Sequence, residues 1–225
     1  KELKIIEKDV GKKLGDLNIK STFINGLRVT DKSVINIVED VLINFNKQIV
    51  DALKNKSCKA KGITSKQNNI IIVEPENDTL GFVGKPIEIK TNTLTKIISS
   101  NEVPVIASLG LNKNNQTFNI NADSVAGAIA KNLKARRLLM LSDVEGVLSK
   151  EKKLTPEINA DQAKQMIIDE TISGGMIPKI NNCLDVAKNG VKAVCIIDGR
   201  KNHSILFELL SHKGSGTLIR EWKIY

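Results

Sequence analysis

The chain has 225 residues, of which 41% are hydrophobic, enough for the core of one large α/β domain or of two lobes that share a sheet. This composition argues against a disordered or fibrous protein. Lys and Arg outnumber Asp and Glu by 34 to 25, but aromatic residues make up only 3% of the chain and the lysines are scattered. Since single-strand binders need a basic groove with aromatic platforms, we do not expect a nucleic acid partner.

The sequence also predicts a soluble, cytoplasmic protein without a membrane partner. It has no apolar run of about 18 residues, and residues 1–10 mix both charge signs without the apolar stretch of a signal peptide. Cys58, Cys183 and Cys195 lack Cys-x-x-Cys spacing, so buried thiols in a reducing compartment are expected. His203 and His212 have no partners at triad or metal spacing, and we expect no metal ion held by the protein itself.

Helical segments alternate with short apolar or β-branched runs along the chain. The first thirty residues contain a lysine-rich helical stretch, and Thr30 and Asp31 then provide capping residues for a long helix over 32–55. Residues 80–90 resemble a hairpin or an edge strand. We expect strands at 69–73, 103–108, 137–142 and 193–198, and further helices at 121–134 and 176–188. This alternation predicts βαβ units on a mostly parallel sheet, with binding sites at the carboxyl ends of strands.

The segment TISGGMIPK places Gly174 and Gly175 directly before a helix, with Lys179 one residue after Pro178. Glycines let backbone N–H groups approach a phosphate, and the helix N-terminus and the lysine add positive charge. A phosphate cradle and an ordinary glycine turn into a helix explain this pattern equally well. It is not a P-loop.

In LLMLSDVEGVL a buried strand runs into Ser142 and Asp143, followed by a turn at Glu145 and Gly146. Polar groups at this end of a strand are typical of nucleotide sites in open α/β sheets, although a simple turn would look similar.

Asn119, Asn121 and Asp123 gather where a strand gives way to an alanine-rich helix. Asn121 can cap this helix and Asp123 can interact with its dipole, as the second Asn-Ala-Asp at 159–161 illustrates. Capping does not explain Asn119, which suits a polar substrate. Arg28 follows a glycine turn in INGLRVTD, where it is either a bidentate carboxylate anchor or part of a surface salt bridge.

Together, seven segments between about residues 15 and 220 resemble the acetylglutamate kinases of the amino acid kinase family: NGLRVTD, LGFVGK, NINADSVAGAIA, LLMLSDVEGVL, ISGGMIPK, IIDGR and GSGTLI. The resemblance implies an α/β fold, an open three-layer αβα sandwich with a mostly parallel central sheet. It implies an acetylglutamate-binding and dimerisation lobe over 1–133 and an ATP-binding lobe over 134–225. The implied reaction is ATP-dependent phosphorylation of the γ-carboxylate of N-acetyl-L-glutamate in arginine biosynthesis, with Mg²⁺ accompanying ATP.

The resemblance also implies roles for individual residues. Arg28 would bind the α-carboxylate of acetylglutamate, with Gly26 and Leu27 beside it, and Asn119 would bind its polar substituents. Asp123 would organise the catalytic lysines, and Lys179 would neutralise charge on the transferring phosphoryl group. The nucleotide would be lined by Asp143, Val144, Glu145, Gly146, Val147, Leu148, Thr171, Ile172, Ser173, Gly174 and Gly175. A homodimer or hexamer is implied, with the helix at 32–55 in the dimer contact.

Three departures from the family matter. Its Lys-x-Gly-Gly and Gly-Gly-Gly segments do not occur in these residues, and family spacing would place them near Val10 and Gly11. Two interpretations are therefore open. The chain is either an active kinase whose full sequence carries these segments, or an inactive pseudo-kinase or regulatory subunit. A basic nucleic-acid-associated α/β protein is a third reading, which explains only the charge. Lys213 stands where arginine-inhibited relatives have a Glu, which leaves sensitivity to feedback inhibition by arginine open.

Overall fold

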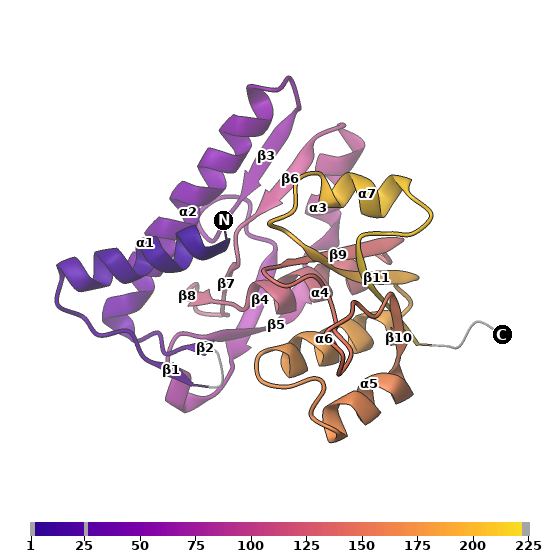
Figure 1. The fold of residues 1–225 in the computed structure, drawn as a ribbon. Coiled ribbons are helices and arrows are strands. Elements are labelled where there is room, and N and C mark those ends of the chain that lie inside the picture. Colours follow the sequence, from indigo (N-terminus) through magenta and orange to yellow (C-terminus); the bar gives the residue numbers. More distant parts are fainter. Residues whose placement is uncertain (1–2, 25–26, 222–225) are drawn as a thin grey trace. The chain divides into compact units, whose positions relative to one another are not determined.

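The computed structural model describes residues 3–24 and 27–221 (Figure 1). The chain divides into two compact units, Glu2–Val125 and Ala126–Tyr225. The division falls within helix α4 (Ala122–Asn132), whereas the lobes expected from the sequence meet just after that helix. Each unit has its own β-strands and its own hydrophobic core.

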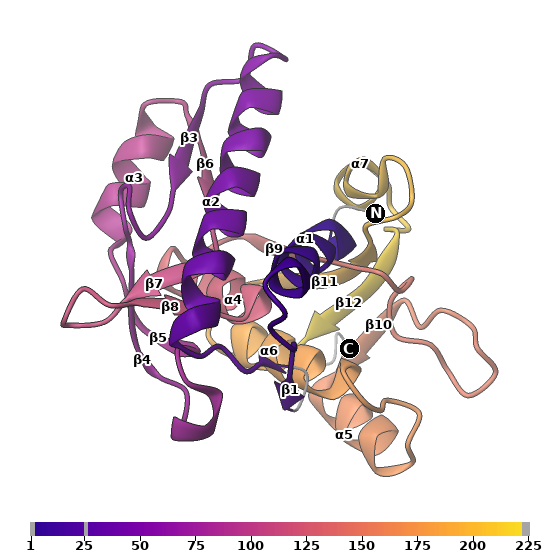
Figure 2. The ribbon, with the colours of Figure 1, turned by 90° about the vertical axis from the view of Figure 1, so that its left-hand side faces the viewer.

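The first unit contains two sheets and a small hairpin. Its larger sheet has the order β5-β4-β7-β8, in which only β4 and β7 run parallel, and β3 and β6 form a separate parallel pair. Helices α2 and α3 lie on opposite sides of the β3–β6 pair (Figure 2). The elements are α1 (Leu3–Asp16), β1 (Phe23–Ile24), β2 (Leu27–Arg28), α2 (Lys32–Lys54), β3 (Ala60–Ile63), β4 (Ile71–Pro75), η1 (Asp78–Leu80), β5 (Gly84–Ile89), α3 (Thr91–Ser99), β6 (Val103–Ile106), β7 (Leu109–Leu111) and β8 (Thr117–Asn119).

Helix α2 begins where the sequence predicts. Asp31 Oδ1 accepts hydrogen bonds from the backbone N–H groups of Ser33 (2.7 Å) and Val34 (3.0 Å), which satisfies two donors of the first turn. The Ser33 hydroxyl and these N–H groups lower the pKa of Asp31. Most of the periodic apolar positions of α2 are buried within the chain, several of them against α1, Ala107 and Leu109. The apolar pattern of α2, on which the expected dimer contact was based, is therefore explained mostly by packing within the chain. Ile49 is an exception, because it is 37% exposed.

The second unit contains one four-stranded sheet with the order β10-β12-β11-β9. The pairs β10–β12 and β11–β9 are parallel, and β11–β12 is antiparallel. Helices α6 and α7 lie on opposite faces of this sheet (Figures 1 and 2). The elements after α4 are β9 (Arg137–Ser142), β10 (Glu157–Asn159), α5 (Ala160–Ile168), α6 (Met176–Lys188), β11 (Ala193–Asp198), α7 (Ser204–Leu210) and β12 (Gly216–Arg220).

Gly216 allows β12 to lie against β11. A Cβ atom at this position would be 2.0 Å from the carbonyl oxygen of Ile196, and because that oxygen belongs to the backbone it cannot easily move aside. The adjoining core is formed by apolar side chains of the sheet and of α6, among them Met140, Val194, Ile219, Ile180 and Val186.

The α/β prediction is confirmed, with parallel strand pairs and helices in both units. The strands predicted from apolar runs are β4, β6, β9 and β11, and the segment 80–90 holds the edge strand β5. The short strands β3, β7 and β10 carry no such signal and were not expected, whereas β8 is the strand that was expected to end near Asn119. Val10 and Gly11, where family spacing would place the missing glycine segments, lie inside α1.

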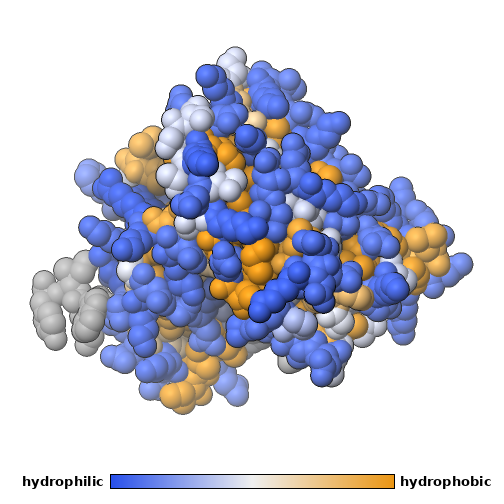
Figure 3. All heavy atoms as spheres, turned by 180° about the vertical axis from the view of Figure 1, so that it is seen from behind, coloured by the Kyte–Doolittle hydropathy of each residue, from blue (hydrophilic) through white to orange (hydrophobic). Residues whose placement is uncertain are grey.

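Hydrophilic residues cover most of the face drawn in Figure 3. In residues 3–24 and 27–221, none of the helices is long and apolar enough to cross a membrane.

Of the three thiols, Cys183 and Cys195 are buried and Cys58 is half-buried, so the expectation of buried thiols is right for two of them. Burial, with a hydrogen bond to Glu208, raises the pKa of Cys195 to about 12.

Candidate functional site

A cavity of about 550 Å³ lies in the second unit, a size typical of small-molecule sites. One wall is the loop after β9 and the other is the turn between α5 and α6. Of the residues expected to line a nucleotide, Val144, Gly146, Val147, Leu148, Thr171, Ile172 and Ser173 line this cavity. Asp143, Glu145, Gly174 and Gly175 do not. Six further lining residues were not expected from the sequence: Ser149, Lys150, Lys152, Asp169, Glu170 and Met176.

A buried hydroxyl fixes the base of the first wall. The fully buried Thr217 accepts a hydrogen bond from Val147 N–H (2.8 Å) and donates one to the carbonyl of Thr155 (2.7 Å). Gly146, with φ of +144°, passes so close that a Cβ atom would lie 2.6 Å from the Thr217 hydroxyl oxygen. The loop is therefore held directly against β12.

Beyond this base, residues 148–154 form a hairpin that carries two lysines at its tip. Leu148 and Leu154 form an antiparallel bridge, and Ser149 N–H donates to the carbonyl of Lys153 (2.8 Å). Lys152 N–H in turn donates to the carbonyl of Ser149 (2.9 Å). Because Lys150 and Lys152 both line the cavity, this wall presents positive charge to it.

The opposite wall is organised by Asp169, the residue that ends α5. Its Oδ1 accepts hydrogen bonds from Thr171 Oγ1 (2.6 Å) and Thr171 N–H (3.2 Å), while its Oδ2 lies 3.2 Å from Lys150 Nζ. The Thr171 hydroxyl, with smaller contributions from Lys150, holds the pKa of Asp169 below its usual value. The carboxylate is therefore charged at neutral pH and joins the two walls.

Gly174 and Gly175 leave the start of α6 open. A Cβ atom at either glycine would have no neighbour within 4 Å, and no side chain caps this helix. Lys179 follows in the first turns of α6 and is half-buried. These features suit a phosphate cradle, and they suit a plain glycine turn as well.

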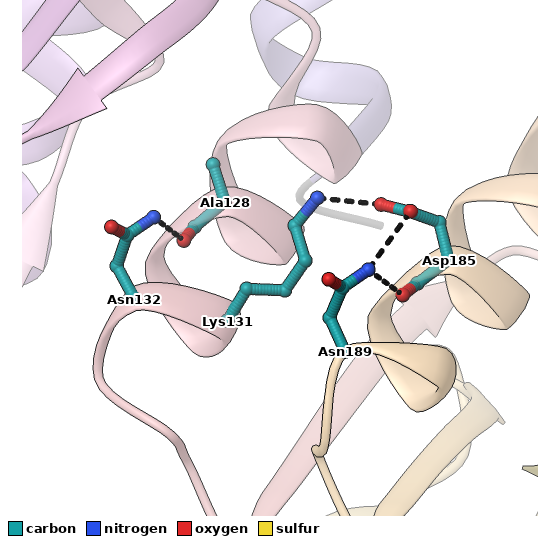
Figure 4. A network of polar contacts seen from close by, with 5 residues as sticks. All are labelled: Ala128, Lys131, Asn132, Asp185 and Asn189. Atoms are coloured by element: carbon teal, nitrogen blue, oxygen red, sulfur yellow. Dashed lines mark hydrogen bonds and ion pairs between the residues drawn. The ribbon is translucent and has the colours of Figure 1, made fainter.

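Helix α6 is held in place by close contact with the later turns of α4 (Figure 4). Lys131 Nζ lies 2.5 Å from Asp185 Oδ2, and Asn189 Nδ2 donates to the carbonyl of Asp185 (2.7 Å). At Gly127 a Cβ atom would be only 2.7 Å from the side-chain oxygen of Asn182. Glycine at this position therefore permits the contact that fixes α6 within the second unit.

Charged groups also gather at the carboxyl ends of β9 and β11, where Ser142 pairs with Asp198. Asp198 is 2% exposed and accepts hydrogen bonds from Arg200 Nε, Nη2 and N–H, each at 2.9 Å. This arginine lowers the pKa of Asp198 to about 2. Glu145 lies 3.0 Å from Lys201, an ion pair outside the cavity lining, which explains why Glu145 is not among the lining residues.

The residues expected to bind an acidic substrate lie in the first unit. Arg28, in β2, donates from Nη1 to Ser21 Oγ (2.7 Å), and its guanidinium carbon lies 4.6 Å from the centroid of the Phe23 ring. Leu27 is the half-buried neighbour of Arg28, and Gly26 lies outside the described residues.

Asn119 and Arg28 are connected through buried Thr30. The Thr30 hydroxyl donates to the carbonyl of Arg28 (3.0 Å), and Asn119 Nδ2 approaches this hydroxyl at 3.5 Å. Phe82 lies between the two segments, because its N–H donates to the Thr30 carbonyl (2.6 Å) and its carbonyl accepts from Asn119 N–H (2.9 Å). The structure thus brings together the segments that carry Arg28 and Asn119.

At the start of α4, Asn121 Oδ1 accepts a hydrogen bond from Ser124 N–H (3.1 Å), as expected for a capping residue. Asp123 lies in the first turn of this helix, where its charge is favourable to the helix dipole. Capping therefore accounts for Asn121 but not for Asn119.

Replacing Thr217 with Val tests the role of the buried hydroxyl. The change keeps the side-chain shape but leaves Val147 N–H and the Thr155 carbonyl without a partner, so the free energy of unfolding should fall by about 1–3 kcal/mol. Urea denaturation measures this, with Thr217→Ser as the control that keeps the hydroxyl. A Thr217→Val protein as stable as the wild type would contradict the assignment.

Comparison with known proteins identifies the family. The amino acid kinase family profile matches residues 6–198. Acetylglutamate kinase of Pelagibacter ubique (strain HTCC1062) is 71% identical over 214 residues, covering 95% of this chain and 74% of that protein. Acetylglutamate kinase of Rhodospirillum rubrum (strain ATCC 11170) is 44% identical over 225 residues, covering 94% of this chain and 73% of that protein.

Solved structures agree with this fold. The smu.665 protein of Streptococcus mutans UA159 matches with a TM-score of 0.82 and 29% identity over 94% of this chain and 82% of that one. N-acetylglutamate synthase of Neisseria gonorrhoeae, in complex with coenzyme A and N-acetyl-glutamate, matches with a TM-score of 0.85 and 20% identity over 96% of this chain and 50% of that one, a likeness of fold. The chain therefore belongs to the amino acid kinase family and, within it, to the acetylglutamate kinases.

Proposed function

We propose that the chain acts as an acetylglutamate kinase, a phosphotransferase that moves the γ-phosphate of ATP to the γ-carboxylate of N-acetyl-L-glutamate in arginine biosynthesis. The supporting observation is 71% identity to a curated acetylglutamate kinase over 95% of the chain. The pseudo-kinase reading is not favoured, because the relatives are named as kinases. The direct test is ADP formation that requires N-acetyl-L-glutamate, whereas ATP binding without turnover would support a pseudo-kinase.

The second unit, Ala126–Tyr225, is proposed to bind ATP. Its cavity has the volume of a small-molecule site, and lysines at its rim suit a polyanionic ligand. Gly174 and Gly175 add backbone that a phosphate can approach without a steric barrier. Mg²⁺ would arrive with ATP and neutralise phosphate charge. In residues 8–24 and 27–221, no three His, Cys, Asp or Glu side chains gather where they could hold a metal ion.

The first unit, Glu2–Val125, is proposed to bind acetylglutamate. A guanidinium fork can hold a carboxylate through two hydrogen bonds, and Arg28 is kept in place by Ser21 and Phe23. Asn119 supplies an amide for the polar substituents of the substrate. Leu27 and Gly26 belong to the same proposed subsite on the basis of family resemblance.

The chemistry of phosphoryl transfer assigns the remaining two residues. Negative charge spreads over the equatorial oxygens in the transition state, so catalysis depends on cations and dipoles held in position. Lys179 is proposed to supply one such cation from the first turns of α6. Asp123 is proposed to hold the catalytic lysines through charge-assisted hydrogen bonds.

Replacing Arg28 with Lys separates substrate binding from chemistry. The lysine keeps the positive charge but loses the fork, and a carboxylate anchor is engaged equally in the ground and transition states. We therefore expect the Michaelis constant for acetylglutamate to rise about tenfold, while that for ATP is nearly unchanged. Steady-state kinetics measures both. A collapse of turnover at unchanged substrate affinity would be the contrary result.

Replacing Lys179 with Ala tests transition-state stabilisation. Loss of one preorganised donor should lower turnover by roughly 10²–10³-fold. Asp123→Asn should lower turnover by a similar factor. The two losses should not add in the double variant, because Asp123 is proposed to act through the catalytic lysines. Steady-state kinetics of the full protein measures this. Turnover of Lys179→Ala within about threefold of wild type would exclude the role, since that loss is well under 1 kcal/mol.

The cytoplasmic location stays a prediction. The chain is also proposed to form a homo-oligomer, either a dimer or a hexamer, in which α2 lies at the dimer contact. Because α2 buries most of its apolar side chains within the chain, the contact would use its remaining surface, including Ile49. Light scattering at micromolar concentration should give at least a dimer mass. A monomer mass would rule out the assembly, and a loss of dimer in Ile49→Lys but not in Ile98→Lys, on the exposed side of α3, would locate the contact.

A further inference from the structure

Two walls of the cavity come from separate segments, with β10 and α5 between them along the chain. The hairpin 148–154 extends from its base at Thr217, and its tip carries Lys150. The facing turn follows α5, and its backbone is left-handed at Glu170, with φ of +60°. A bulky residue adopts this conformation only in a tight turn that its surroundings hold.

Asp169 connects both segments through separate oxygens of one carboxylate. Oδ1 holds the turn through the hydroxyl and N–H of Thr171, and Oδ2 reaches Lys150 on the hairpin. All three residues line the cavity. The Lys150 side chain is 61% exposed and that of Asp169 is 30% exposed, so the ion pair lies at the mouth of the cavity.

We propose that Asp169 is a positioning residue for nucleotide binding, which ties Lys150 to the Thr171 turn and so sets the two walls before the nucleotide arrives. The role rests on the proposed function, in which ATP occupies this cavity. If the tip of the hairpin is already ordered before the nucleotide binds, less conformational entropy is lost on binding. Asp169 is therefore expected to affect nucleotide affinity rather than the chemical step.

The test uses Asp169→Asn, which keeps an oxygen that can accept from Thr171 but removes the charge that holds Lys150. Hydrogen exchange of residues 148–154 in the free protein should become about two- to fivefold faster, the range expected from an exposed ion pair. The dissociation constant for ATP with Mg²⁺, measured by calorimetry, should rise by a similar factor. The turnover number at saturating ATP should stay unchanged.

Three further variants isolate the pair. In hydrogen exchange, Lys150→Met should reproduce the effect of Asp169→Asn, the double variant Asp169→Asn with Lys150→Met should be no worse than either single one, and Lys150→Arg should retain wild-type behaviour. Glu151→Gln is the matched control, because it removes one negative charge from the same hairpin while its side chain can still accept from Ser149 Oγ. We expect it to change neither measurement.

Unchanged exchange in Asp169→Asn, or fully additive effects in the double variant, would overturn the role while leaving the ATP site intact. A drop in turnover at unchanged ATP affinity would also overturn it. If the wild-type protein does not bind ATP, the proposed function fails and the role of Asp169 fails with it. The exchange measurement needs no nucleotide, so the two failures can be told apart.

Discussion

The candidate nucleotide site depends on one buried hydroxyl group. Thr217 satisfies a donor on the loop after β9 and an acceptor before β10, and it has no exposure to solvent. Its own position depends on Gly216, without which β12 could not lie against β11. The register between β11 and β9 then places Ser142 opposite Asp198 and starts the cavity loop at that sheet end. The first wall of the cavity is therefore a direct product of how the sheet is assembled.

The second wall obeys a different constraint, because it is a turn between two helices. Asp169 and the left-handed Glu170 end α5, and α6 begins a few residues later at an uncapped glycine pair. The location of α6 is set by its contact with α4, where Gly127 brings the helices close and Lys131 pairs with Asp185. One wall of the cavity is therefore positioned by the packing of the sheet and the other by the packing of helices. The cavity lining combines apolar side chains with two lysines and a structured carboxylate.

Local features of the sequence predict much of this fold. The start of α2 follows from Asp31 because a cap acts on neighbouring N–H groups, and strands such as β9 and β11 follow from apolar runs. Similarity of short motifs predicts many cavity residues, because the motifs are the loops themselves. Lys150 and Asp169 give no such signal. They are charged residues on polar segments, and only tertiary folding shows that they pair. Thr30 gives no such signal either, because its hydroxyl links Arg28 to Asn119, two residues that are far apart in the sequence. Gly127 is a further case, because the sequence shows only a glycine in an alanine-rich helix and not the close contact with α6 that requires it.

The three thiols differ enough in environment to be chemically distinct. Cys195 stays protonated far above neutral pH and, like Cys183, is shielded from solvent, whereas Cys58 lies half-exposed between α2 and β3. Since alkylating reagents need an accessible thiolate, a maleimide dye or a nitroxide label should attach at residue 58 alone. Among these three thiols, Cys58 is thus the attachment point for a spectroscopic probe in the first unit, so that ligand-dependent movements can be followed there without first removing Cys183 and Cys195.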